Sequence, residues 1–190
     1  MEEKISKFLL IGFLMTFVIF VSTEARIEKL TTKFSADINK DGKKELLVHD
    51  FYGGTAGFGE LRIYNLKGEK IFAKKVEGDP YLWHPEKHLP ALNPNFFPDM
   101  DKDGIVEILI GYRKETGVLS HVEELWWFDV YKWNGKTYIL ADAKFPDFYK
   151  DQFVYYASFL KQNGTCETVE KFIKKAQRLA GIKIATWRYL

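Results

Sequence analysis

Two short acidic segments of nearly the same pattern lie 62 residues apart in this chain, at 37–45 and 99–107. In each segment, acidic or amide residues alternate with other residues, a glycine follows the third of them, and a glutamate ends the pattern. Alternate oxygen-bearing side chains converge from one side of a tight turn, and glycine permits the sharp bend. The sequence therefore predicts a cation-binding loop at each segment, with Ca²⁺ as the preferred ion because all of the ligands are oxygens.

Electrostatic repulsion supports a bound cation in these loops. Neighbouring carboxylates about 4 Å apart repel by about 4 kcal/mol at an effective dielectric constant near 20, and the second segment carries four of them. A metal-free turn remains the alternative, because Asp and Asn side chains also accept hydrogen bonds from nearby backbone amides. Asp101 replaces the neutral Asn39, so the charge count predicts tighter calcium binding in the second loop.

The two halves of the chain are similar beyond the acidic segments. An aliphatic run of strand length follows each segment, at 46–48 and 108–110. A glycine-rich connection then leads to a second strand, which begins at Glu60 in one repeat and Glu124 in the other. The spacing has grown there from 62 to 64, which predicts a connection two residues longer in the second repeat. Turns at Lys-Gly and Asn-Gly then predict hairpins with returning strands at 70–76 and 136–141.

Together these features resemble the FG-GAP repeats of integrin-α-type calcium-binding β-propellers, in two divergent copies within residues 26–144. The resemblance implies a mainly β fold, with two antiparallel repeats arranged like propeller blades or as a small sandwich, and structural Ca²⁺. Two repeats cannot close a ring of blades, so we expect a sandwich closed by the C-terminal segment, with a ring of several chains as the alternative. The implied ligands are Asp37, Asn39, Asp41, the carbonyl oxygen of Lys43 and Glu45 in the first loop, and Asp99, Asp101, Asp103, the carbonyl oxygen of Ile105 and Glu107 in the second.

Neither loop is an EF-hand. The twelfth position, which carries a bidentate glutamate in an EF-hand, is Val48 in the first loop and Ile110 in the second. The glutamate at the ninth position would have to close each site, and a strand rather than a helix is expected to follow it.

Residues 1–25 are predicted to be a secretion signal. Lysines precede an uncharged apolar run at 8–21, and small residues occupy the two positions that a signal peptidase reads. An uncleaved N-terminal membrane anchor through residues 8–22 is the alternative. We therefore expect an extracytoplasmic protein, secreted or periplasmic. Cys166 is the only cysteine, so packing and bound metal are expected to stabilise the chain in place of an intrachain disulfide.

The pattern changes from strand to helix in the C-terminal region, 145–190. Apolar residues at helical spacing predict one helix at 146–162 and a second at 167–180, separated by Asn-Gly. This helical hairpin is expected to cover an exposed sheet, with docking to a partner or a membrane surface as the alternative. The pattern at 182–190 is compatible with a final strand.

The composition excludes few functions and points to none directly. The 28 basic and 26 acidic residues nearly balance, so net charge does not imply a nucleic-acid partner. The sequence contains no Gly-x-Ser-x-Gly elbow, His-Glu-x-x-His motif, phosphate-binding loop or paired-cysteine zinc site. We therefore expect a non-enzymatic binding or adhesion-like module with an unknown protein or carbohydrate ligand. The alternatives are a small metal-dependent hydrolase and an envelope assembly subunit docking through its C-terminal helices. The expected ligand face includes Tyr52, Tyr81 and Trp83, and the hydrolase would use His84, His88 and Asp50.

Overall fold

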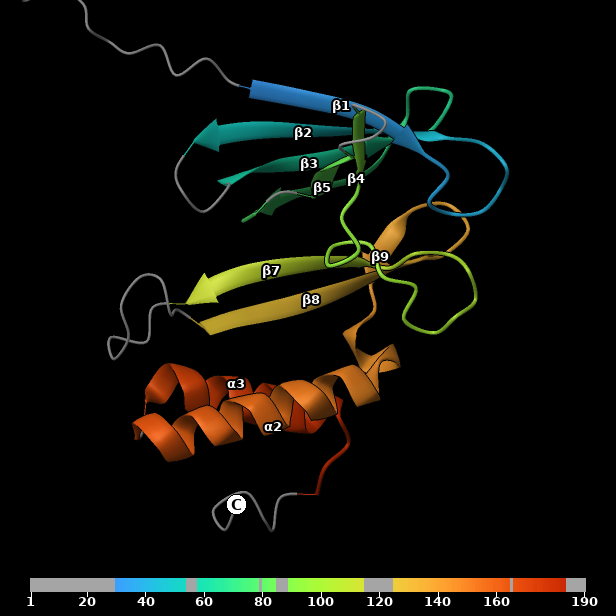
Figure 1. Ribbon diagram of the computed structural model, residues 1–190. Coiled ribbons are helices and arrows are strands. Elements are labelled where there is room, and N and C mark those ends of the chain that lie inside the picture. The colour runs from blue at the N-terminus through green and yellow to red at the C-terminus, as the bar shows by residue number, and fades with distance from the viewer. Residues whose placement is uncertain are drawn as a thin grey trace, which may run out of the picture.

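The computed structural model of this chain describes residues 30–53, 58–78, 80–84, 89–114, 125–164 and 166–183. The fold is mainly β, with a four-stranded and a three-stranded antiparallel sheet, a short two-stranded hairpin and a C-terminal pair of helices. Figure 1 shows the four-stranded sheet at the top, β7 and β8 in the middle and the helices α2 and α3 below them. The fold class expected from the sequence is confirmed.

The four-stranded sheet follows the order of the sequence, β1-β2-β3-β4. Leu47, Leu61 and Ile63 point to one side of it and are fully buried, whereas Leu46 and Arg62 point to the other side. The strands predicted after the first acidic loop are thus confirmed. The sequence analysis did not predict β1, because only Leu30 and Phe34 among its residues are large and apolar. The bounds are Leu30–Ala36 for β1, Glu45–Gly53 for β2, Phe58–Tyr64 for β3 and Lys70–Val76 for β4.

The three-stranded sheet has the order β7-β8-β9 and contains the predicted Asn-Gly hairpin. The Asn134 side-chain oxygen accepts hydrogen bonds from the backbone N–H groups of Lys136 and Thr137, both at 2.9 Å. Gly135 adopts a φ of 93°, a conformation that favours glycine. The bounds are Ile108–Lys114 for β7, Leu125–Trp133 for β8 and Tyr138–Leu140 for β9, and the separate hairpin consists of β5, Tyr81–His84, and β6, Leu89–Leu92.

The strand registers define how the two repeats correspond. Leu46 pairs with Tyr64 in the first repeat, and Ile108 pairs with Tyr131 in the second. The first strands of the repeats are therefore 62 residues apart, as predicted, but their partner strands are 67 residues apart. The predicted spacing of 64 is wrong, because it depended on a repeated Glu-Leu pair and not on backbone pairing. The second connection is five residues longer than the first.

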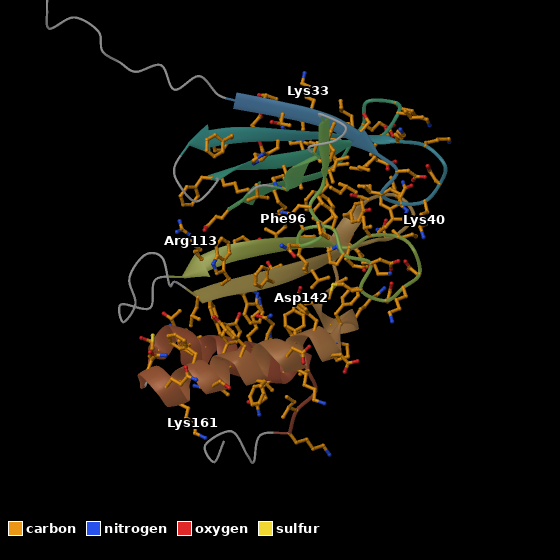
Figure 2. The ribbon with its side chains drawn as sticks, in the orientation of Figure 1. Lys33, Lys40, Phe96, Arg113, Asp142 and Lys161 are labelled. Atoms are coloured by element: carbon orange, nitrogen blue, oxygen red, sulfur yellow. The ribbon has the colours of Figure 1, made fainter. Side chains whose placement is uncertain are left out.

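A hydrophobic core joins the two larger sheets. The Phe72 ring of β4 packs edge-on against Tyr131 at 5.2 Å and against Tyr138 at 6.1 Å between ring centroids. Phe96 lies between the sheets in Figure 2 and packs against the same core. The chain therefore buries one face of its first sheet against its own second sheet. Other buried members are Phe34, Leu47, Leu61, Ile63 and Val76 from the first sheet and Ile108 and Ile110 from the second.

The helical pair covers the second sheet from the opposite side. The 3₁₀ turn Asp142–Lys144 leads into α2, Pro146–Asn163, which is followed by α3, Glu167–Leu179. The Trp127 ring of β8 lies 5.5 Å from that of Tyr149, 6.2 Å from that of Tyr156 and 5.4 Å from that of Phe172. Both predicted helices are confirmed, and their apolar residues form this second core. Its other buried members include Val130, Phe153, Val169, Ile173 and Ala176.

The helical pair also satisfies backbone groups at the open edge of β8. The Tyr149 hydroxyl donates a hydrogen bond to the Phe128 carbonyl oxygen at 3.0 Å, and the Tyr156 hydroxyl donates to the Trp126 carbonyl oxygen. The Val130 N–H donates to Asp142 at 2.8 Å, and Figure 2 shows Asp142 between the sheet and the helices. Burial is the main cause of the raised pKa of both tyrosine hydroxyls. They therefore stay protonated and able to donate at neutral pH.

Several predictions concern residues outside the described ranges. These are the secretion signal or anchor at 1–25, the glycine-rich connection at 54–57, His88, and most of the final strand at 182–190. Within the part of the chain that the structure describes, no helix combines the length and the apolar character that crossing a membrane requires.

Candidate metal centre

The two acidic loops lie side by side. The first connects β1 to β2, and the second precedes β7. The carbonyl oxygen of the buried Ile38, in the first loop, accepts hydrogen bonds from the Val106 N–H of the second loop at 3.2 Å and from the Tyr138 hydroxyl of β9 at 3.1 Å. Lys40 marks this end of the molecule in Figure 2. The loops therefore form one acidic region, although they are far apart in the sequence.

Alternate side chains of the first loop stabilise the turn itself. Asp37 accepts a hydrogen bond from the Gly42 N–H at 3.1 Å. Asn39 accepts one from the Asp41 N–H at 3.0 Å, and Asp41 accepts one from the Lys43 N–H at 2.9 Å. The φ of 83° at Gly42 explains why the pattern needs glycine there. A side-chain oxygen of each of these three predicted ligands is thus used inside the turn.

Glu45 closes the first loop. Its carboxylate is buried and accepts hydrogen bonds from the Ile38 N–H and from the Asn39 side-chain amide, both at 3.1 Å. Burial raises the pKa of Glu45, because a desolvated carboxylate is less stable in its charged form. Both donors to the closing glutamate of the first loop are neutral groups.

The second loop repeats this hydrogen-bonding scheme. Glu107 is 0% exposed and accepts the Met100 N–H at 2.8 Å, as Glu45 accepts the backbone N–H at the corresponding position of the first loop. Asp103 accepts the Ile105 N–H at 2.8 Å. Gly104 has a φ of 86°. Both loops thus share one backbone architecture, closed by a buried glutamate.

Carboxylate oxygens converge in the second loop. Oxygens of Asp99, Asp101 and Glu107 all lie within 4.8 Å of one another. Calcium–oxygen distances of about 2.3–2.6 Å place opposite ligands about 5 Å apart, so these oxygens can reach a single ion. Among the residues that the structure describes, no other three acidic side chains gather so closely. The donor set contains only oxygens, which suits a hard cation.

Lys132 of β8 is a member of this region that the sequence patterns did not reveal. Its ammonium nitrogen lies 2.7 Å from Asp101, 2.7 Å from Asp103 and 3.0 Å from Glu107. The only available signal was a lysine within a strand of mostly aromatic and aliphatic residues. Nothing in that signal indicates which acidic side chains the lysine contacts.

The charges of the second loop are strongly coupled. Burial alone would lower the pKa of Lys132, but its hydrogen bonds to three carboxylates outweigh that effect and raise the pKa. The hydrogen bond from Lys132 lowers the pKa of Asp103. Burial is the largest influence on Glu107 and raises its pKa. The Lys132 ammonium therefore contacts three of the four carboxylates of the loop, and the loop retains an excess of negative charge.

The residues suggested for a hydrolase do not form a described site. Asp50 is 2% exposed, forms an ion pair with Arg62 and accepts a hydrogen bond from the Thr31 hydroxyl at 2.7 Å. His84 lies at the end of β5, with no description of its side chain, and His88 is outside the described residues. Asp50 is thus occupied by contacts within the first sheet.

The predicted ligand aromatics are described only in part. Tyr52 is exposed, and its hydroxyl donates a hydrogen bond to Glu60 at 3.3 Å. Tyr81 and Trp83 lie on β5, but their side chains are outside the description. Cys166 immediately precedes α3 and packs, partly buried, against the core between the second sheet and the helices.

Comparison with known proteins does not assign a family or a function to the chain. No protein-family model, curated protein or solved structure matches the chain. The fold and the site together define a mainly β protein with two adjacent acidic loops, one of which gathers three carboxylates. Its function has to be inferred from these features.

Proposed function

We propose that this chain is an exported, calcium-stabilised binding module of the FG-GAP type, without catalytic activity of its own. The observation that carries the proposal is the convergence of Asp99, Asp101 and Glu107 within 4.8 Å, in a loop that leads directly into β7. The closing glutamates of both loops are buried and bonded to backbone amides, an arrangement suited to holding a fold together.

Calcium would supply the positive charge that these loops need. In the second loop it would be held by the side chains of Asp99, Asp101, Asp103 and Glu107. Ile105 would contribute its carbonyl oxygen. The equivalent ligands of the first loop are Asp37, Asn39, Asp41, the carbonyl oxygen of Lys43, and Glu45. Because both loops precede core strands, a bound ion would stabilise both sheets.

The outer face of the first sheet, which no described residue fills, offers a surface for a ligand. On the second sheet, the equivalent face is buried against the first sheet. Ile108 there corresponds to Leu46, and Ile110 corresponds to Val48. On the first sheet this face is instead a hollow of about 800 Å³, and Leu46 is 40% exposed. Its lining combines apolar, hydroxyl and basic groups, which suits a protein or carbohydrate ligand. The basic residues are Lys33, Lys44 and Arg62.

A metal-dependent hydrolase has less support. Its proposed carboxylate, Asp50, is already paired with Arg62 and Thr31. An envelope assembly subunit would need a docking face on the helices. The apolar stripe of α3 is buried against the second sheet within the chain, and the large apolar side chains that α2 exposes are Val154 and Tyr155. The binding module therefore accounts for more of the described contacts.

Calcium is expected to raise the melting temperature of the full-length protein. With Kd values of about 10⁻⁴ to 10⁻³ M, 10 mM calcium would add about 1.4–2.7 kcal/mol of stability per occupied site. For a chain of this size, that corresponds to a rise of roughly 3–10 °C. The measurement is a thermal melt followed by circular dichroism in calcium, magnesium or EDTA. Identical melts in all three would refute calcium stabilisation.

Ligand binding is expected to depend on the hollow of the first sheet. We expect Leu46→Asp combined with Leu66→Asp to abolish signals that the wild-type protein gives on glycan and peptide arrays. Leu66 is 69% exposed, so its substitution should not disturb the core. The matched control is Leu140→Asp, because Leu140 is 56% exposed but lies on the second sheet. Retained signals in the double variant would place the ligand elsewhere.

A further inference from the structure

We propose that Lys132 is a tethered competitor of calcium in the second loop. Its ammonium offsets part of the negative charge of the carboxylates when calcium is absent and has to leave when calcium binds. This inference rests on the proposed function, since it concerns the same loop, and it makes Lys132 the residue that sets the calcium affinity of that loop.

The position of the ammonium supports this competition. It contacts three of the four predicted ligand side chains, at 2.7, 2.7 and 3.0 Å, and an ammonium has three N–H groups to donate. Asp101 and Glu107 belong both to this contact set and to the converging group of carboxylates. A calcium ion bound by the same oxygens would lie next to a like charge. The two cations therefore exclude each other from the loop.

The side chain of Lys132 has a route away from the loop. Lys132 pairs with Ile139 near the end of β8, so its backbone is fixed by the hairpin. Its four-carbon stem is flexible, and its partners Asp101 and Asp103 are exposed to solvent. The ammonium can therefore move into water while the strand pairing is kept.

The first loop has a different arrangement at the corresponding position. Because Tyr64 corresponds to Tyr131 in the strand registers, Asn65 corresponds to Lys132. Asn65 instead stabilises the β3–β4 turn, where its side-chain oxygen accepts the N–H groups of Lys67 at 2.9 Å and Glu69 at 3.0 Å.

Without a lysine at this position, the first loop should bind calcium more tightly than the second. This is the reverse of the order predicted from the charge count, in which Asp101 favoured the second loop over Asn39 in the first.

Amine labelling of the full-length wild-type protein tests the displacement directly. After a short pulse of acetic anhydride, mass spectrometry would measure the modification of Lys132 and of Lys136, an exposed lysine in the turn of the same hairpin. Saturating calcium is expected to raise labelling of Lys132 severalfold and to leave Lys136 unchanged. If calorimetry shows that both loops are filled and labelling of Lys132 does not change, the inference is overturned.

Calorimetry on variants separates this inference from the proposed function. In an Asp41→Ala background, which disables the first loop, Lys132→Met is expected to bind calcium at least tenfold more tightly, or about 1.4 kcal/mol. Lys132→Arg keeps the charge and should retain the weak affinity. Equal affinities for the Met variant and its parent would overturn the inference alone. Absence of calcium binding in every protein, including wild type, would overturn the proposed function as well. Should Lys132→Met not fold, the labelling experiment decides.

Discussion

Replacement of Glu107 by alanine is expected to lower the free energy of unfolding by about 3 kcal/mol or more. Glu107 is 0% exposed, accepts the Met100 N–H at 2.8 Å and contacts the Lys132 ammonium at 3.0 Å. The substitution leaves a buried N–H without its acceptor and removes one partner of a partly buried ion pair. Urea denaturation of the full-length protein, followed by circular dichroism, would measure the loss.

A matched control separates this effect from a general loss of negative charge. Glu167 is 83% exposed and pairs with Lys171 on the helix surface, so Glu167→Ala should leave the stability nearly unchanged. If the two substitutions have the same effect, Glu107 does not anchor the second loop.

Truncation of Trp127 to alanine should destabilise the protein by about 3–5 kcal/mol. Its ring packs against Tyr149, Tyr156 and Phe172, so the substitution opens a cavity where β8, α2 and α3 meet. Trp127→Phe retains part of the packing and should cost less than half as much. Denaturant unfolding would be followed in parallel by far-ultraviolet and near-ultraviolet circular dichroism.

The shape of that unfolding transition carries further information. Because the aromatic cluster joins the helices to the second sheet, the two signals should shift together in the Trp127→Ala variant. A helical signal that melts separately, with the sheet unaffected, would show that α2 and α3 contribute little to the stability of the sheets.

Local patterns predicted most of the fold. The helix expected at 146–162 is Pro146–Asn163 in the structure, because helical spacing and the Asn-Gly break are both local signals. The Asn-Gly hairpin at Asn134 is likewise local, since the side chain bonds within its own turn. The convergence of three acidic residues in the second loop follows from alternation within a single short segment.

Contacts between distant segments were not predictable in the same way. Lys132 contacts Asp101 across 31 residues and Glu107 across 25, and no sequence periodicity predicts contacts over such separations. Tyr156 belongs to the apolar side of α2, but its hydroxyl partner on β8 depends on how the helix lies across the sheet. Hydrophobic patterns specify which face is buried, whereas the partners of polar groups depend on the tertiary arrangement.

The edge of β8 also has a consequence for synthesis of the chain. Its backbone groups are satisfied by Asp142, Tyr149 and Tyr156, all of which follow the strand in the sequence. A nascent chain that has just completed its sheets would therefore present an unprotected strand, able to pair with the same strand of a neighbouring polypeptide. Translation of the last fifty residues removes that opportunity for intermolecular β-sheet growth, and a premature stop before them would preserve it.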